Sequence, residues 1–323
     1  MTFRARGLYA SSSKESRRFR WGPWMLLGGV LVVVLVVLTG LSVLGNVVAH
    51  QSDKTDSYGG ASALSVNNDT GGHIEVGAAE GDEIVVERTL RGGPLSEPEE
   101  RIDDGGDSLD VDGRCDGFPL FSTCSIDYNI QVPEDVSVTL ENNSGNVEVR
   151  NLASELSVNS VSGSIEVFEH EGSVDVEATS GTISLSDITG SVRAHNVSGD
   201  IEADGEGERL EVSTTSGSVD VEDFTAKEVV AESVSGSLEL GGGFTTLEAA
   251  TTSGGVEITT DTPFELMEVE TVSGGVEATV PAGTYEIGGE STSGDRDFDV
   301  DTSSESDSRI EVDTTSGSVR VGS

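Results

Sequence analysis

The stretch Ser162-Gly163-Ser164-Ile165-Glu166-Val167 decides the fold, because variants of it recur along the chain. A later copy reads Ser216-Gly217-Ser218-Val219-Asp220-Val221. The glycines of the successive copies are Gly145, Gly163, Gly181, Gly199, Gly217, Gly236, Gly254, Gly274, Gly294 and Gly317. Self-similarity at a period of about 18 residues is the signature of a protein built from stacked repeats.

Apolar and acidic residues alternate within each copy. Successive side chains of a β-strand point to opposite sides, so Ile165 and Val167 are predicted to face inward and Glu166 outward. Equivalent residues form two predicted inward columns, which begin with Val147 and Val149. A chain that is only 5% aromatic must bury many such small aliphatic side chains to obtain a core.

The repeat predicts an all-β fold, a parallel β-solenoid with coils of about 18 residues. A half-period through Gly172 and Gly190 gives each coil two short strands and two turns. Glycine at a fixed turn position permits positive φ or a close approach between coils, and the serines before the glycines would form a hydroxyl ladder. An antiparallel meander with Ser-Gly hairpin turns is the competing geometry.

Two further features concern how the repeat grows and ends. The residue before each serine alternates between valine and threonine, as in Val161, Thr179, Val197 and Thr215, which indicates duplication of a two-coil unit. In the last copies the pattern degrades, and Arg296 occupies an inward position. Such irregularity is typical of a capping end.

The N-terminal region predicts a membrane anchor. Residues 1–24 form a basic tail, and Met25–Ala49 contains no charged residue, which is enough length for one transmembrane helix. Arginines before the helix predict a cytoplasmic N-terminus, so the C-terminal domain would be extracellular at the cell membrane. A cleaved signal peptide ending at Val47-Val48-Ala49 is the alternative.

The part outside the membrane is predicted to begin with a polar spacer, residues 50–62, and to continue as one β-repeat domain over residues 63–323. Residues 92–125 are expected to be a loop and disulfide insertion, with a clear loop from Gly92 to Gly106. Cys115 and Cys124, the only cysteines, lie where oxidation is permitted. A structural disulfide is therefore predicted, in preference to a redox or metal role.

The charge of the chain limits its partners. After residue 49 there are 12 basic and 58 acidic residues, a net charge of −46. Such a surface repels phosphate backbones, so no nucleic acid partner is expected. Stacked outward carboxylates predict that salt or weak divalent cation association favours folding. Asp110-Val111-Asp112-Gly113 lacks the spacing of a calcium-binding EF-hand loop.

Residues with the spacing of an active site are not recognised in the sequence. The carboxylates follow the repeat and are interpreted as a solvated face, and no catalytic residue, cofactor site or metal site is assigned. His50, His73, His170 and His195 show no metal spacing and are expected to be isolated surface histidines.

The predicted anchor, the cysteine loop, the segment Tyr128-Asn129-Ile130-Gln131-Val132-Pro133 and the serial Ser-Gly repeats together resemble a known family. It is the bacterial "putative adhesin" β-strand-repeat family, a domain of unknown function, in its actinobacterial membrane-anchored type. The resemblance covers residues 64 to 323. It implies a right-handed β-helix-like fold at the cell envelope, and no catalytic residues to carry over.

Two functional classes remain besides catalysis. The first is a membrane-anchored, surface-exposed adhesin or binding module, whose partner is a cell-envelope polymer or another envelope or membrane protein. The second is a sensory or regulatory component of the envelope that acts through a partner. A polysaccharide-acting β-helix enzyme is less favoured, because no carboxylates are predicted to converge in a cleft with aromatic platforms.

Overall fold

The computed structural model describes residues 28–36, 50–93, 96–117 and 124–323. It divides the chain into two compact units, Met1–Val48 and Ala49–Ser323. In the first unit residues 28–36 are helical. The basic tail and most of the expected membrane segment lie outside the described residues, and the described part of the chain contains no helix of the length and hydropathy needed to span a membrane.

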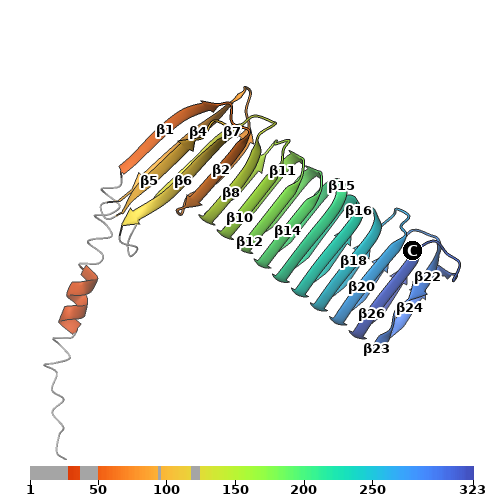
Figure 1. Ribbon diagram of the computed structural model, residues 1–323. Helices are drawn as coiled ribbons and strands as arrows, with labels where there is room; N and C mark the ends of the chain where they lie inside the picture. The colour runs from red at the N-terminus through yellow and green to blue at the C-terminus, as the bar shows by residue number, and fades with distance from the viewer. Residues whose placement is uncertain (1–27, 37–49, 94–95, 118–123) are drawn as a thin grey trace, which may run out of the picture. The chain divides into compact units, whose positions relative to one another are not determined.

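The second unit is a parallel β-solenoid (Figure 1). In one coil, β10 (Leu156–Ser162) leads through the Ser-Gly turn into β11 (Ile165–Glu171). Strand β10 pairs in parallel with β8 and β12, and β11 pairs in parallel with β9 and β13. The parallel solenoid predicted from the repeat is therefore confirmed, and the antiparallel meander is excluded for these coils.

Each coil contributes one strand to each of two faces. The first face contains β2, β8, β10, β12, β14, the C-terminal halves of β15 and β16, β18, β20 and β26. The second contains β3, β9, β11, β13, the N-terminal halves of β15 and β16, β17, β19, β21 and β27. Strands β15 and β16 pass from one face to the other without a break.

The remaining strand bounds are as follows: β1 His50–Gly59, β2 Ala63–Asp69, β3 Ile74–Ala78, β4 Glu83–Gly92, β5 Ser96–Asp104, β6 Ser108–Gly117, β7 Ser125–Val132, β8 Ser137–Ser144, β9 Val147–Arg150, β12 Val174–Ser180, β13 Ile183–Thr189, β14 Val192–Ser198, β15 Ile201–Ser216, β16 Val219–Ser235, β17 Leu238–Gly241, β18 Phe244–Ser253, β19 Val256–Thr259, β20 Leu266–Ser273, β21 Val276–Thr279, β22 Thr284–Gly288, β23 Ser291–Ser293, β24 Arg296–Asp299, β25 Asp301–Thr302, β26 Arg309–Ser316 and β27 Val319–Gly322.

The core lies between the two faces and consists of stacked aliphatic columns. Ile165 pairs in register with Val147 on one side and Ile183 on the other, and all three are fully buried. Val167 belongs to the second predicted column and is also fully buried. At about 1.5 to 3 kcal/mol for each buried aliphatic side chain, such columns supply the stability that scarce aromatics cannot.

The repeated glycines let consecutive coils touch at the turn. A Cβ atom on Gly163 would lie 2.0 Å from the carbonyl oxygen of Gly145, and Gly163 has a φ of +122°. Serines before the glycines, such as Ser162, are exposed. Several turn carbonyls are instead bonded from inside by a buried polar residue three positions before a glycine: Asn196 Nδ2 donates to the Gly181 oxygen at 2.7 Å.

The N-terminal insertion is more strand-like than expected. Residues 50–59, expected to be a spacer, form β1, which pairs antiparallel with β4 because its backbone groups complete an otherwise open edge. The expected loop from Gly92 to Gly106 is wrong, since β5 occupies Ser96–Asp104 and pairs antiparallel with β6. Pro98 is tolerated there because, in the part of the chain that is described, β5 pairs on one side only.

A buried ion-pair cluster holds these added strands together. The Arg88 side chain on β4 donates from Nε to Glu100 on β5 at 2.6 Å and from Nη2 to Asp56 on β1 at 2.5 Å. The Arg88 and Glu100 side chains are each 5% exposed. Removing one partner of such a cluster would leave a buried charge uncompensated.

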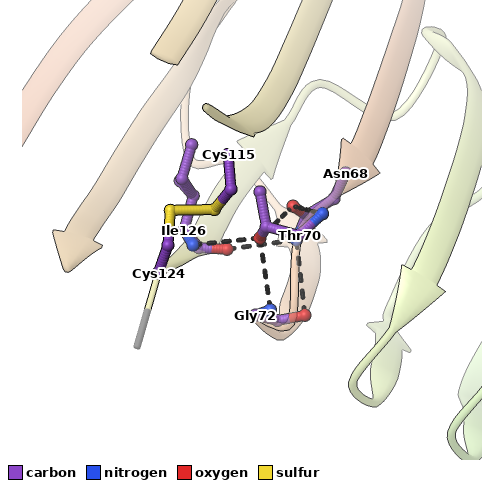
Figure 2. The surroundings of a disulfide bond; sticks show 6 residues. All are labelled: Asn68, Thr70, Gly72, Cys115, Cys124 and Ile126. Atoms are coloured by element: carbon purple, nitrogen blue, oxygen red, sulfur yellow. Dashed lines mark hydrogen bonds between the residues drawn. A yellow bond between two sulfur atoms is a disulfide. The ribbon is translucent and has the colours of Figure 1, made fainter. Parts of the chain in front are cut away.

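The predicted disulfide is confirmed: Cys115 and Cys124 are bonded, with their Cα atoms 6.0 Å apart. Figure 2 shows the bond beside a hydrogen-bond network at the first Gly turn. Thr70 Oγ1 accepts from the Ile126 amide at 3.0 Å, and Asn68 Nδ2 donates to the Ile126 carbonyl at 3.0 Å. The network ties the turn after β2 to the start of β7, directly after Cys124.

Coils at both ends are not stacked in chain order. The coil Ala63–Ala78 lies between β6 and β7 of the insertion and the coil of β8 and β9. At the other end, the C-terminal strands β26 and β27 pair with β20 and β21, and strands β22 to β24 pair outside them. Arg296 thus lies opposite Val319 in the outermost coil and donates to the carbonyls of Gly288 and Gly289.

Candidate ligand-binding trough

One line of outward side chains on the first face alternates between two residue types, and we call it the Val/Thr column. It follows the edge next to the Ser-Gly turns. Its members, in spatial order, are Val161, Thr179, Val197, Thr215, Val234, Thr252, Val272, Thr315 and Thr292. The four valines are 40% to 52% exposed, which is unusual for so regular an apolar series.

A second line of outward side chains runs parallel to the first, two residues earlier in each strand, and we call it the polar column. Its members are Asn67, Glu141, Asn159, Glu177, His195, Ser213, Glu232, Ala250, Glu270, Asp313 and Glu290. Buried residues such as Thr214, whose hydroxyl donates to the carbonyl of Gly199, lie between the two columns and line the floor of the hollow.

The surface between the two columns is hollowed along the solenoid, and we call it the trough. A hollow of about 420 Å³ lies over the strands from β2 to β14, and one of about 730 Å³ lies over the strands from β14 to β26 and β23. His195 lines both, and its Nδ1 lies 2.8 Å from Ser213 Oγ of the next coil. The two hollows therefore meet at His195.

The larger hollow is electrostatically negative. Glu232, Glu270, Glu290 and Asp313 line it, and none of its described lining residues is a lysine or arginine. Partial burial, together with the nearby carboxylates of Glu311, Glu248, Glu270 and Asp313, raises the pKa of Glu268. The carboxylates of this face therefore already destabilise one another, and a cationic partner would relieve that repulsion.

The arrangement suits binding better than catalysis. Its carboxylates lie at equivalent positions on neighbouring strands, as Glu270 and Asp313 do, and are not gathered at one point. Within the described part of the chain, no group of three or more histidine, cysteine or acidic side chains is placed to hold a metal ion. The other long line of carboxylates, which includes Glu166, Glu202 and Glu257, lies on the second face.

The site residues predicted from the sequence lie outside the trough. The ten repeat glycines form the turn edge, and the disulfide of Cys115 and Cys124 belongs to the N-terminal insertion. The valine–threonine alternation is visible in the sequence, but its placement along one exposed line depends on the register between coils. One expectation is wrong: His170 is buried, because it occupies an inward register position opposite Ile188.

The fold and this surface define a class of protein: a parallel β-solenoid with a long, ordered outer groove. More particularly, the chain belongs to the family described as Toastrack DUF4097, which it matches over residues 122–208 and 203–322. No curated protein is significantly similar in sequence.

Solved structures with a similar arrangement share little sequence with this chain. A "putative adhesin" from Parabacteroides merdae is 13% identical, with a TM-score of 0.48 over 84% of this chain and 96% of that one. A "putative adhesin" from Bacteroides fragilis is 11% identical, with a TM-score of 0.38 over 84% and 97%. A "putative lipid binding protein" from Parabacteroides distasonis is 12% identical, with a TM-score of 0.40 over 85% and 97%.

Proposed function

We propose that this protein is a non-catalytic binding module of the cell envelope, anchored through Met25–Ala49, with a cytoplasmic N-terminus and the solenoid outside. The trough is its binding surface. A polymer or extended segment of another envelope component lies in it along the solenoid axis.

The continuity of the trough is the observation that carries this proposal. From Val161 to Thr292 there are eight steps of about 4.8 Å, so the column extends over about 38 Å. Enzyme sites concentrate their chemistry in one enclosed pocket. Here equivalent groups are offered many times along one line, which suits a partner that is itself long and repetitive.

The test is retention of the full-length chain, purified in mild detergent, on insoluble cell-wall polymer and on solubilised envelope membrane proteins. Thr215→Arg with Thr252→Arg would fill the trough with two long side chains at exposed positions. Thr259→Arg with Thr279→Arg makes the same chemical change at exposed positions of the second face.

Saturable retention that the trough variant loses and the second-face variant keeps would support binding in the trough. Retention that both variants share equally would overturn the proposal. If the only retained partner is a membrane protein and retention ignores the trough, the protein is a regulatory component that acts through that partner.

A further inference from the structure

The Val/Thr column has a period that restricts what can lie along it. Neighbouring strands are about 4.8 Å apart, so residues of the same type recur every two coils, at about 9.6 Å. Val161, Val197, Val234 and Val272 therefore present apolar contacts at about 9.6 Å intervals, separated by threonines that offer hydroxyl groups. A partner that contacts all four valines needs a matching repeat.

Peptide conformations differ in how well they match this spacing. A polyproline II helix has three residues per turn and a rise of 3.1 Å, which gives a repeat of about 9.3 Å. A β-strand presents one side every two residues, at about 6.6 Å, and an α-helix every 5.4 Å, so neither stays in register with the valines. Over the three intervals between the four valines, the polyproline II helix drifts by only about 1 Å.

Charge adds a second restriction. The polar column places Glu232 beside Val234, Glu270 beside Val272 and Asp313 beside Thr315. No lysine or arginine lines the larger hollow in the described part of the chain. A cationic partner would be attracted to this wall and a polyanion repelled. The described trough lining also contains no Phe, Tyr or Trp to serve as a platform for sugar rings.

We propose that the trough binds an extended basic peptide in the polyproline II conformation. Proline or aliphatic residues at every third position meet the exposed valines, and the lysines or arginines between them face the carboxylates of the polar column. Because the polyproline II helix leaves its backbone carbonyls unpaired, they can accept hydrogen bonds from the threonine hydroxyls between the valines. This inference rests on the proposed function and names the class of its partner.

The test measures fluorescence anisotropy of a labelled peptide of about five Pro-Pro-Lys repeats with the full-length chain in mild detergent. A Gly-Ser-Lys peptide of equal length and charge is the flexible comparison, and a glucosamine oligomer is the glycan comparison. We expect the Pro-Pro-Lys peptide to bind about tenfold more tightly than the flexible peptide, because its conformation is already formed.

Two sets of variants separate the apolar repeat from the charge. Changing Val161, Val197, Val234 and Val272 together to threonine removes the 9.6 Å apolar repeat at exposed positions while keeping β-branched side chains, and we expect affinity to fall about tenfold. Glu232→Gln, Glu270→Gln and Asp313→Asn should weaken binding, whereas Glu202→Gln, Glu239→Gln and Glu257→Gln on the second face should not.

The outcomes that overturn the inference are distinct from those that overturn the proposed function. Equal affinity for the two peptides, or equal losses from the two charge variants, would show unspecific attraction between opposite charges and end the inference. If the glucosamine oligomer binds instead and the valine variant abolishes that binding, the trough remains a binding surface but its partner is a glycan.

Discussion

At the scale of single residues, the turn glycines bring the backbones of successive coils into direct contact. Gly254 illustrates this, because a Cβ atom there would lie 1.9 Å from the carbonyl oxygen of Gly236 in the preceding coil. That oxygen belongs to the backbone and cannot rotate away. A Cβ atom on the next residue, Gly255, would have its nearest neighbour 3.7 Å away. Of these two adjacent glycines, only Gly255 therefore has room for an alanine side chain.

We therefore expect Gly254→Ala to lower the free energy of unfolding by about 2 to 3 kcal/mol, because the coils must separate to admit the methyl group. Gly255→Ala should change it by less than about 0.5 kcal/mol. Urea unfolding followed by far-ultraviolet circular dichroism measures both, and the transition midpoints are compared. Equal midpoints for the two variants would show that the coils are not in backbone contact at this turn.

His170 is a residue whose protonation opposes folding. It is buried, and burial lowers its pKa from an ordinary value of 6.5, while the backbone at Ser154 and Ser173 offsets that shift only in part. Because the pKa is lower in the folded state, the unfolded chain binds more protons as pH falls through 6.5. Stability is therefore lost on acidification below that value and is fully present above it.

The prediction for His170 is a difference between two pH profiles. As pH is lowered from 7 to 5, the wild-type unfolding temperature should fall relative to that of His170→Leu, which lacks the titrating group. His195→Gln, at an exposed position, serves as the control and should follow the wild type. Parallel profiles for wild type and His170→Leu would show that the pKa of His170 is the same in the folded and unfolded states.

At the scale of elements, parallel in-register pairing places like residues on top of one another. This benefits the apolar columns, but it also aligns Glu248 of β18, Glu268 of β20 and Glu311 of β26 on the first face. The pKa of Glu268 is raised, by partial burial and then by these neighbours. A raised carboxyl pKa means that stability is lost as pH rises through it, so the ionised column opposes folding at neutral pH.

Glu268→Gln should therefore raise the unfolding temperature at pH 7, and the gain should shrink as sodium chloride is added and screens the column. It should also shrink below pH 4, where the wild-type carboxyl group is protonated as well. Glu177→Gln is the matched control, because Glu177 lies between Asn159 and His195. A salt-independent gain, or an equal gain from Glu177→Gln, would contradict the repulsion between stacked carboxylates.

The elements differ in how far the sequence reveals them. Strands such as β11 and β13 were predictable, because the alternation of Ile165, Glu166 and Val167 is strict and the glycine period fixes the register. Strand β5 was not predictable, since Pro98 and a cluster of charged residues are typical of a loop. Its pairing also depends on β6, which the local sequence does not indicate. The trough also escaped prediction, because it is formed by outward residues from many coils rather than by one motif.

At the scale of the whole molecule, the solenoid closes both ends in the same way. The coil nearest each end in sequence is covered by an inserted segment, β4 to β7 at one end and β22 to β25 at the other. The repeat spacing could not reveal this order, because the glycines at 274, 294 and 317 look alike in sequence. Their spatial order is Gly274, Gly317, Gly294.

In this order β26 and β27 lie between the coil of β20 and β21 and the outer strands β22 to β24. Deleting residues 309–323 should therefore unfold the outer coil as well as remove the deleted one. Strands β22 to β24 pair with β26 and β27, and they would lose those partners although residues 284–299 remain in the chain. Hydrogen exchange with mass spectrometry should show residues 284–302 unprotected in the truncated protein. The coil of β10 and β11 is the internal control, because solenoid coils depend mainly on their neighbours and its protection should not change. Full protection of residues 284–302 would mean that the outer coil docks on β20 and β21 without the C-terminal strands.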